Sequence, residues 1–194
     1  DVDRSRGLGD VYKRQALMLK VLDQNFGIKN AMMTNVHAYT SDQPLADSVR
    51  SDLRRSRSAV ENIIPNETWA PDYVSQLLPK FKNKISGMAM NVPVANGSCV
   101  DLTTEMSSMP SIEEVNNAFK DASENELIDL IRYTEDPIVS SDAIGGGETM
   151  VFDSKATMIA SNKLLKTIAW FDNGWGFANR ILELSESYNE LESN

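Results

Sequence analysis

Cysteine and histidine each occur once in the 194 residues, and no long apolar run is present. The single cysteine, Cys99, cannot form a disulfide within the chain, which is typical of proteins in a reducing compartment. No apolar run approaches the ~20 residues that a membrane-spanning helix needs, and the first residues lack the apolar segment of a signal peptide. We therefore expect a cytoplasmic protein without a membrane partner.

Basic residues are also scarce, because 19 Lys and Arg stand against 28 Asp and Glu and the net charge is −9. Such a chain lacks the broad cationic face that duplex DNA or RNA requires, so we expect no nucleic-acid partner. Four of the arginines gather in one stretch, at Arg50, Arg54, Arg55 and Arg57. A local patch of guanidinium groups suits a small anion better than a polymer.

The first 15 residues differ from the rest of the chain. They show no periodic apolar pattern, and the string at 10–15 resembles the translated ends of incompletely assembled environmental sequences. We interpret residues 1–15 as a foreign or disordered segment and base no functional inference on them. Residues 16–194 contain no internal repeat and no linker, so we expect one domain.

The remaining pattern predicts the α+β class. Helical patterns occupy 16–26, 66–78, 111–122, 124–132 and a final segment from 174. Strand patterns occupy 28–38, 87–94, 98–105, 138–142, 150–153, 157–160 and 166–171. Asn96-Gly97 lies between two of these strands and predicts a hairpin turn. Separate helices beside such hairpins indicate an α+β domain.

His37 lies where the strand 28–38 meets a long polar loop, residues 39–62. A single histidine beside a strand is more often structural than catalytic. A loop that follows a strand, however, carries functional residues disproportionately. As a general base, His37 would need a thiol or hydroxyl within hydrogen-bonding reach. Cys99 falls in the middle of a strand, and we interpret it as a small buried apolar residue.

The arginine cluster has two interpretations. With the hydroxyls of Thr40 and Thr68 it could bind a phosphate through charge-assisted hydrogen bonds. With Asp47 and Asp52 it could instead form a solvated or intersubunit network of ion pairs.

Asn173 also has two interpretations. Its amide could bind a carboxamide ligand, or it could cap the helix that follows. The run Gly145-Gly146-Gly147 lacks the lysine and the strand-to-helix context of a phosphate loop, and we predict a plain turn there.

Several longer strings follow one another in a fixed order between residues 16 and 190. They lie at 20–22, 26–28, 36–43, 52–57, 63–65, 92–93, 100–102, 133–137, 139–142 and 170–180. Together they resemble the catalytic domain of the glyceraldehyde-3-phosphate dehydrogenase family, of which erythrose-4-phosphate dehydrogenase is a close relative. The resemblance implies a mixed, largely antiparallel sheet with helices on one face.

The resemblance also implies roles for individual residues. His37 would be the general base that raises the thiolate character of a catalytic cysteine. Phosphate-binding roles would fall on Thr40, Asp42, Arg54, Arg55 and Thr68. The first two would line the substrate-phosphate site, and one of the arginines with the threonine at 68 would bind inorganic phosphate.

On the cofactor side, the resemblance implies that Asn173 holds the nicotinamide carboxamide of NAD or NADP. The loop after His37 would be the family's interface loop, packed across a homotetramer. That role would explain a long polar loop in a compact domain.

The sequence departs from the family pattern at four matched positions. Asn91 replaces the strand arginine that grips the substrate phosphate, and Trp69 replaces the glycine after the phosphate-binding threonine. Loss of a guanidinium removes a charge-assisted hydrogen bond, typically ~1.5–3 kcal/mol. On the cofactor-binding side, Gly174 stands where an acidic residue is usual, and Phe177 where tyrosine is usual.

Two parts of the family pattern are missing. The Rossmann-type cofactor domain with its glycine-rich fingerprint is absent, and so is the nucleophile motif. A gapless count from Lys20 places Asp10 at the position of the catalytic cysteine. A carboxylate cannot replace a thiolate in thioester chemistry.

We therefore expect a fragment of a phosphorylating, NAD(P)-dependent aldehyde dehydrogenase that acts on a small phosphorylated aldehyde through a cysteine thioester. The fragment itself is predicted to be inactive, and no metal site is expected. One alternative is a non-catalytic binding or assembly paralogue of the same fold. Another is an erythrose-4-phosphate-type dehydrogenase.

Overall fold

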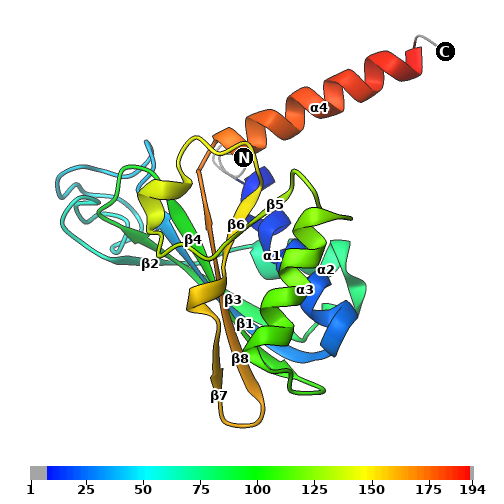
Figure 1. The fold of residues 1–194 in the computed structure, drawn as a ribbon. Coiled ribbons are helices and arrows are strands. Elements are labelled where there is room, and N and C mark those ends of the chain that lie inside the picture. The colour runs from blue at the N-terminus through cyan, green and yellow to red at the C-terminus, as the bar shows by residue number, and fades with distance from the viewer. Residues whose placement is uncertain (1–7, 193–194) are drawn as a thin grey trace.

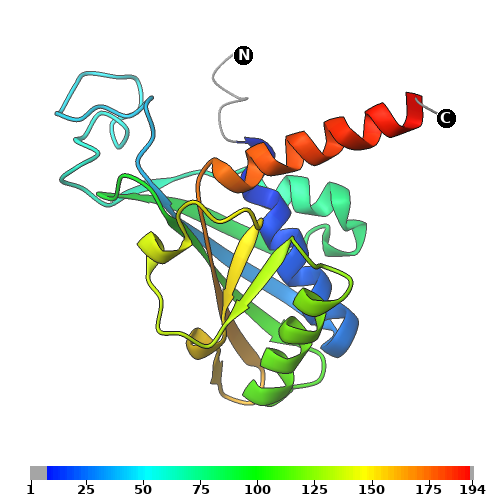
Figure 2. The ribbon, with the colours of Figure 1, turned by 45° about the horizontal axis from the view of Figure 1, so that its top comes forward.

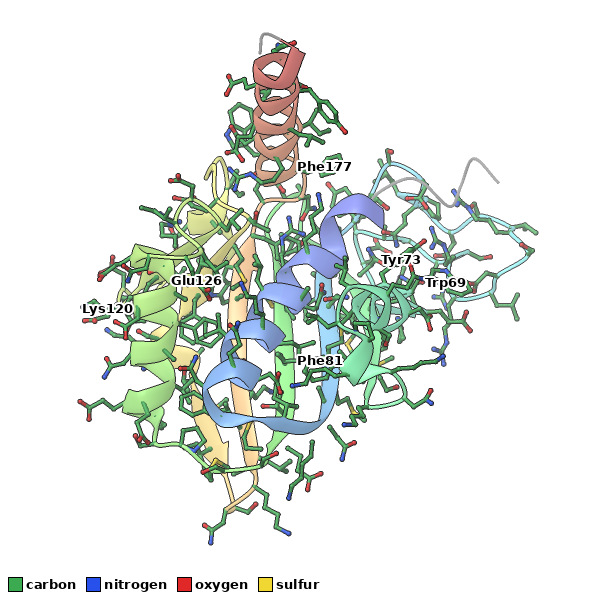
Figure 3. All side chains as sticks on the ribbon, turned by 90° about the vertical axis from the view of Figure 1, so that its right-hand side faces the viewer. Trp69, Tyr73, Phe81, Lys120, Glu126 and Phe177 are labelled. Atoms are coloured by element: carbon green, nitrogen blue, oxygen red, sulfur yellow. The ribbon has the colours of Figure 1, made fainter. Side chains whose placement is uncertain are left out.

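The computed structural model describes residues 8–192 and contains one mixed sheet covered on one face by helices (Figures 1 and 3). The strand order is β2-β3-β1-β4-β8-β6-β5, and β7 pairs with β8. The β1–β3 and β5–β6 pairs are parallel, and the others are antiparallel. The expected α+β class, with a largely antiparallel sheet and helices on one face, is confirmed.

The elements follow one another in this order. They are α1 (Leu8–Phe26), β1 (Ile28–Ala38), β2 (Ile64–Asn66), α2 (Ala70–Leu77), η2 (Pro79–Phe81), β3 (Ile85–Val92), β4 (Ser98–Met106), α3 (Ile112–Glu124), β5 (Ile131–Thr134), η3 (Ser140–Ala143), β6 (Met150–Asp153), η4 (Ser154–Ala156), β7 (Met158–Ala160), β8 (Leu164–Phe171) and α4 (Trp175–Glu192).

The hairpin predicted at Asn96-Gly97 is wrong, because β1 lies between β3 and β4 and pairs with both. The connection from β3 to β4 instead passes over the carboxyl end of β1. There Tyr39 N donates to Val94 O at 3.0 Å, and Ala38 N donates to Ser98 Oγ at 3.1 Å. Gly97 has φ +85°, which favours glycine, and a Cβ there would collide with the carbonyl of Ser140.

The first helix begins earlier than predicted, at Leu8 instead of Ala16. Residues 8–15, which we assigned to a foreign or disordered segment, are therefore helical in the structure, and residues 1–7 lie outside the described part of the chain. Two polar side chains explain how this part packs. Arg14 Nε donates to Thr149 O at 2.8 Å, and Gln15 Nε2 donates to Asn35 Oδ1 at 2.6 Å. The foreign origin of residues 1–15 stays a prediction.

Two other predicted elements are wrong. Residues 124–132 do not form a separate helix, because α3 extends to Glu124 and a turn with Asp129 at φ 66° leads directly into β5. Residues 138–142 are not a strand but lead into the short 3-10 helix η3. The predicted capping box of α3 is confirmed, since Ser111 and Glu114 each bond the backbone N–H of the other.

One hydrophobic core lies between the helices and the sheet. Phe119 of α3 stacks on Phe152 of β6 with ring centroids 3.8 Å apart. The helices contribute Met18, Leu19, Leu22, Val74, Val115 and Phe119, and the strands contribute Met33, Val100, Leu102, Phe152, Leu165 and Phe171, all at most 2% exposed.

Two segments project from this body (Figures 1 and 2). One is the loop 39–63, which is ordered by its own bonds, including Ser48 N to Ser56 O and Ala59 N to Pro44 O, both at 2.8 Å. The other is α4, which points away from the sheet and exposes Ile181, Leu182 and Leu184. None of the helices described here is long and apolar enough to cross a membrane.

Gly87 is required where β3 approaches β1 most closely. A Cβ at this position would lie 2.7 Å from the carbonyl oxygen of Met33, its partner across the strand pair. We expect Gly87→Ala to lower the free energy of unfolding by about 1–3 kcal/mol, because a methyl group must be forced into a packed interface. Urea denaturation of this variant and of Ser86→Ala, an exposed neighbour on the same strand, measures the effect. Equal stabilities of the two variants would contradict it.

Candidate active site

His37 is the second-last residue of β1 and lies in register with Asn91 of β3. Its Nδ1 lies 2.9 Å from the carbonyl oxygen of Ala38. A carbonyl can only accept, so Nδ1 carries a proton, and Nε2 is the ring nitrogen whose protonation can change. The ring also meets Phe171 of β8 edge-on, with centroids 6.1 Å apart. The imidazole is thus oriented by a backbone carbonyl and an aromatic ring.

Arg14 stacks on the same aromatic ring. Its guanidinium carbon is 3.7 Å from the Phe171 centroid, and its side chain is 1% exposed. Nη2 donates to the carbonyl of Asp172 at 3.2 Å. The sequence of residues 1–15 did not predict this contact, because the burial of an arginine cannot be recognised from the residue type alone. The first helix therefore reaches the neighbourhood of His37.

Ser98 joins the end of β1 to the segment after β8. Its hydroxyl accepts the N–H of Ala38 at 3.1 Å and donates to Oδ1 of Asn173 at 2.5 Å. Ser98 is 2% exposed, so these hydrogen bonds are shielded from water. His37 and Asn173, assigned to different roles from the sequence, are thereby linked through one serine and one alanine.

The helix cap predicted as the alternative role of Asn173 belongs to Asp172 instead. Asp172 Oδ1 accepts the N–H groups of Gly174 and Trp175 at 2.8 Å. Oδ2 accepts Gly145 N at 3.1 Å and Asn96 Nδ2 at 3.0 Å. Burial raises the pKa of Asp172, but these four donors outweigh burial and keep the pKa below its usual range. An Asp that bonds the backbone N–H groups two and three positions on is typical of the turn that precedes a helix, and the sequence interpretation missed this signal.

Thr40, Asp42 and Arg55 form one cluster at the start of the projecting loop. The Thr40 hydroxyl donates to Asp42, and the Arg55 guanidinium makes an ion pair with the same carboxylate. Arg50 also donates to the carbonyl of Asp42. Burial raises the pKa of Asp42, but the Thr40 hydroxyl and the Arg55 and Arg50 charges together keep it below its usual range. The cluster therefore holds an ionised carboxylate.

Arg54 and Arg55 also line a pocket of ≈ 560 Å³ together with Trp69. Its other lining residues are Asp52, Pro65, Asn66, Glu67, Gly87 and Met88. Figure 3 shows Trp69 at the start of α2, on the side of the loop 39–63. The Arg54 side chain makes no ion pair within the described residues, whereas Arg55 is paired. Of the two arginines, Arg54 is the one whose guanidinium is available to an anion.

The ion-pair interpretation of the arginine cluster applies to part of it. Arg57 pairs with Asp47 at 3.1 Å, as that interpretation expected, and both side chains are exposed. Asp52 instead accepts the backbone N–H groups of Arg54 and Arg55, at 2.8 and 3.2 Å. An exposed ion pair such as Arg57–Asp47 contributes little to the free energy of unfolding.

Asn91 belongs to the surroundings of His37 and not to the pocket lining. Its Nδ2 donates to Ala38 O at 3.2 Å, the same oxygen that faces His37 Nδ1, and its Oδ1 accepts from Asn66. Thr68 faces its own helix, since its hydroxyl accepts the N–H of Ala70 at 3.2 Å. The structure thus brings Asn91 next to His37, while none of the contacts described here joins Thr68 to His37.

Phe177 lies on the first turn of α4, where that helix meets α1 (Figure 3). The half-buried ring has the ammonium of Lys13 5.0 Å from its centroid. Phe177 thus supplies an aromatic ring, and Asn173 an amide, near the point where α4 leaves the sheet.

Cys99 is buried in β4 and is 8% exposed. Burial, followed by the nearby Asp101 carboxylate, raises the pKa of this thiol to about 11. A thiol of that kind is a poor nucleophile at neutral pH, which agrees with its interpretation as a small apolar residue. No group of three or more His, Cys, Asp or Glu side chains suited to a metal ion occurs within residues 8–192.

Comparison with known proteins gives one consistent family. Residues 15–173 match the model of the glyceraldehyde 3-phosphate dehydrogenase C-terminal domain. Glyceraldehyde-3-phosphate dehydrogenase 2 of Streptomyces avermitilis is 48% identical over 170 residues, which cover 88% of this chain and 51% of that protein. Glyceraldehyde-3-phosphate dehydrogenase 1 of Bacillus subtilis is 45% identical over 166 residues, 86% of this chain and 50% of that protein. The chain thus spans about half the length of the curated relatives it matches.

We expect the Asp172 cap to stabilise the chain at neutral pH and to lose that effect in acid. Asp172→Asn replaces an acceptor that faces Gly145 and Asn96 by a donor, so the free energy of unfolding should fall by about 1 kcal/mol at pH 7. Because the folded-state pKa lies below the ordinary value of 3.8, the difference should persist above pH 3.8 and vanish as pH falls through the folded-state value. Urea titrations of both forms from pH 7 to pH 2 test this, with exposed Asp121→Asn as control. A difference that is constant with pH would contradict it.

We also expect Cys99 to resist thiol reagents in the folded chain. With a pKa of about 11 against an ordinary 9.0, its thiolate fraction at pH 8 is about 100-fold smaller than that of a normal cysteine. The rate of labelling by a thiol-specific chromophore, measured with and without denaturant, should differ by at least this factor. Rapid labelling of the native chain would show that Cys99 is accessible and ionised.

Proposed function

This chain belongs to the glyceraldehyde-3-phosphate dehydrogenase family, and from that premise we propose that it is the catalytic domain of a phosphorylating, NAD(P)-dependent aldehyde dehydrogenase. The observation that carries the proposal is the setting of His37. It lies at the carboxyl end of a central strand, with Nδ1 fixed on the Ala38 carbonyl at 2.9 Å. A general base needs this kind of rigid orientation.

His37 would act through Nε2, because Nδ1 is engaged by the carbonyl. It would take the proton of a cysteine thiol and, as the acid form, return that proton to the oxygen of the substrate carbonyl. The thiolate would add to the aldehyde carbon to give a thiohemiacetal. Loss of a hydride to the bound cofactor would convert it to a thioester, and inorganic phosphate would cleave the thioester to an acyl phosphate and free the thiolate. Asp10 occupies the matched position of that cysteine, so we propose that the chain as written does not turn over.

The substrate class that we propose is a small phosphorylated aldehyde, with inorganic phosphate as the second substrate. Arg54 supports this because its guanidinium makes no ion pair within the described residues and lines the ≈ 560 Å³ pocket. Arg50 and Arg55 contact the ionised Asp42, so their positive charge is partly neutralised by this carboxylate and is less available to a phosphate. Thr40 and Thr68 are the hydroxyls we assign to the phosphate sites.

The residues near α4 fit a nicotinamide cofactor. Asn173 places an amide beside the end of β1, and Phe177 offers a half-buried ring. When bound, the cofactor would accept a hydride from the substrate. These residues would orient its carboxamide and cover the ring.

We further propose a cytoplasmic homotetramer in which the loop 39–63 is the interface loop. It projects from the body (Figure 2). Its apolar side chains Leu45, Val49 and Leu53 are each more than 60% exposed. Exposed apolar side chains grouped on one projection are typical of an interaction surface.

A rival proposal is supported by Asn91 and Trp69. Asn91 brings a neutral amide to the neighbourhood of His37 where the family has a guanidinium, and the Trp69 indole takes up space at the pocket. These features favour a catalytically silent assembly paralogue, or an enzyme such as an erythrose-4-phosphate-type dehydrogenase with a different phosphorylated aldehyde.

A chimera tests these proposals. Residues 16–194 would be joined to the half of the Streptomyces avermitilis relative that this chain does not cover, including its cysteine segment. We expect NADH formation from glyceraldehyde 3-phosphate and phosphate, and a loss of about 10²–10⁴-fold in kcat with His37→Gln, the contribution typical of a general base. Asn116→Ala, a remote variant on α3, is the control.

The possible results separate the candidates. Turnover on erythrose 4-phosphate alone would select the second dehydrogenase. A correctly assembled chimera without turnover on either aldehyde would contradict the enzymatic proposal and favour the silent paralogue.

A further inference from the structure

The Ser98 hydroxyl lies between the proposed base and the proposed cofactor ligand. We propose that Ser98 is a positioning residue that fixes the orientation of the Asn173 amide and so decides which hydrogen-bonding group Asn173 offers. The inference rests on the proposed function, because the ligand concerned is the carboxamide of a nicotinamide cofactor. The evidence is a set of hydrogen bonds around a residue that is 2% exposed.

The direction of each bond follows from the chemistry of the groups. A serine hydroxyl has one proton and two lone pairs. The N–H of Ala38 can only donate, so at 3.1 Å it occupies a lone pair of Ser98 Oγ. The hydroxyl proton is then directed to Asn173 Oδ1 at 2.5 Å. The oxygen end of the Asn173 amide is therefore engaged inside the protein.

The nitrogen end of the same amide is the end that a ligand can use. Within the described residues, Asn173 Nδ2 has no hydrogen-bond partner, and the side chain is half-buried. An amide group offers two N–H donors at that end and no acceptor. Asn173 would thus recognise the carbonyl oxygen of a carboxamide and not its NH2 group.

The backbone of Asn173 is held from the same side. Its N–H donates to Asn96 Oδ1 at 3.4 Å, and Asn96 Nδ2 donates to Asp172 Oδ2 at 3.0 Å. Asn96 belongs to the segment that crosses the end of β1, and Ser98 is the first residue of β4, directly after it. The peptide is fixed by Asn96 and the side-chain orientation by Ser98, so the two effects can be separated by mutation.

Ser98 also acts on the base, through Ala38. The N–H that Ser98 accepts is in the peptide that follows His37, and the carbonyl of Ala38 lies 2.9 Å from His37 Nδ1. Removal of the hydroxyl leaves a buried N–H without an acceptor, which the surrounding backbone must accommodate by moving. We therefore expect one substitution to affect both the amide and the imidazole.

NMR spectroscopy of the ¹⁵N-labelled chain tests this, because His37 is the single histidine and its ring nitrogens are identified without ambiguity. In the unmodified chain, the Asn173 Nδ2 protons should be remote from Ser98, and a deuterium isotope shift should show that the Ser98 hydroxyl donates to Asn173 Oδ1. In Ser98→Ala the orientation preference should fall about five-fold, the effect of one neutral hydrogen bond. The His37 Nδ1 signal should shift as well.

Two further variants sharpen the result. Ser98→Thr keeps a hydroxyl and should restore both signals toward those of the unmodified chain. Ser154→Ala removes another buried hydroxyl, which donates to Thr134 O at 2.6 Å and belongs to η4, and it should change neither signal. If Ser98→Ala does not fold, the orientation in the unmodified chain and in Ser98→Thr decides.

Three results would overturn the inference. They are Nδ2 protons close to Ser98 in the unmodified chain, unchanged Asn173 and His37 signals in Ser98→Ala, and equal shifts in Ser154→Ala. None of these measurements depends on turnover. A chimera that is active although its Asn173 amide points the other way would overturn this inference alone, whereas an inactive chimera with the expected orientation would overturn the proposed function alone.

Discussion

The candidate site depends on the fixed carboxyl end of β1. This strand pairs with β4 as far as Val36 and with β3 through its last residue, Ala38. In addition to this pairing, Ala38 gives its N–H to Ser98 and its carbonyl to His37 and Asn91. A histidine held in this way keeps one tautomer and one direction. The neighbouring loop, the cofactor-side amide and the pocket are all placed relative to that end.

The surroundings of His37 and the projecting loop differ in the kind of polar contact that they contain. Around His37 the polar contacts are mostly between neutral groups, since Asn66, Asn91, Ser98 and Asn173 bond one another or the backbone. Around the projecting loop, arginines and carboxylates meet directly, as in Arg55–Asp42. Such neutral networks avoid the desolvation penalty of buried ions, and every bond in them is directional. The substitution at position 91 therefore changes the electrostatics near His37 while leaving a satisfied network.

Much of the fold and part of the site could be predicted from the sequence. The predictions of the strand at 28–38 and of the capping box at Ser111 were correct because they depend on local patterns. The longer sequence strings were sufficient to identify the family. The position of β1 between β3 and β4 was missed, because an Asn-Gly turn reports local backbone shape and not which strand lies beside it. Arg14 was missed because its burial depends on Phe171, more than 150 positions away in the chain. Asp172 and Ser98 were passed over because serine and aspartate are common at turns, and only the assembled fold shows how many segments converge on each.

The crossing of β1 by the segment between β3 and β4 has a consequence for how this domain acquires its structure. No hairpin of neighbouring strands can start this half of the sheet, because the first partners of β1 are far along the chain. Each pairing must close a long loop before it gains stabilising contacts, and such topologies fold slowly. During that time the backbone N–H and C=O groups along both edges of β1 are unpaired. A nascent chain of this kind is therefore prone to aggregation until β4 has paired with β1. The rate of synthesis and the binding of chaperones then affect how much of the chain reaches the folded state.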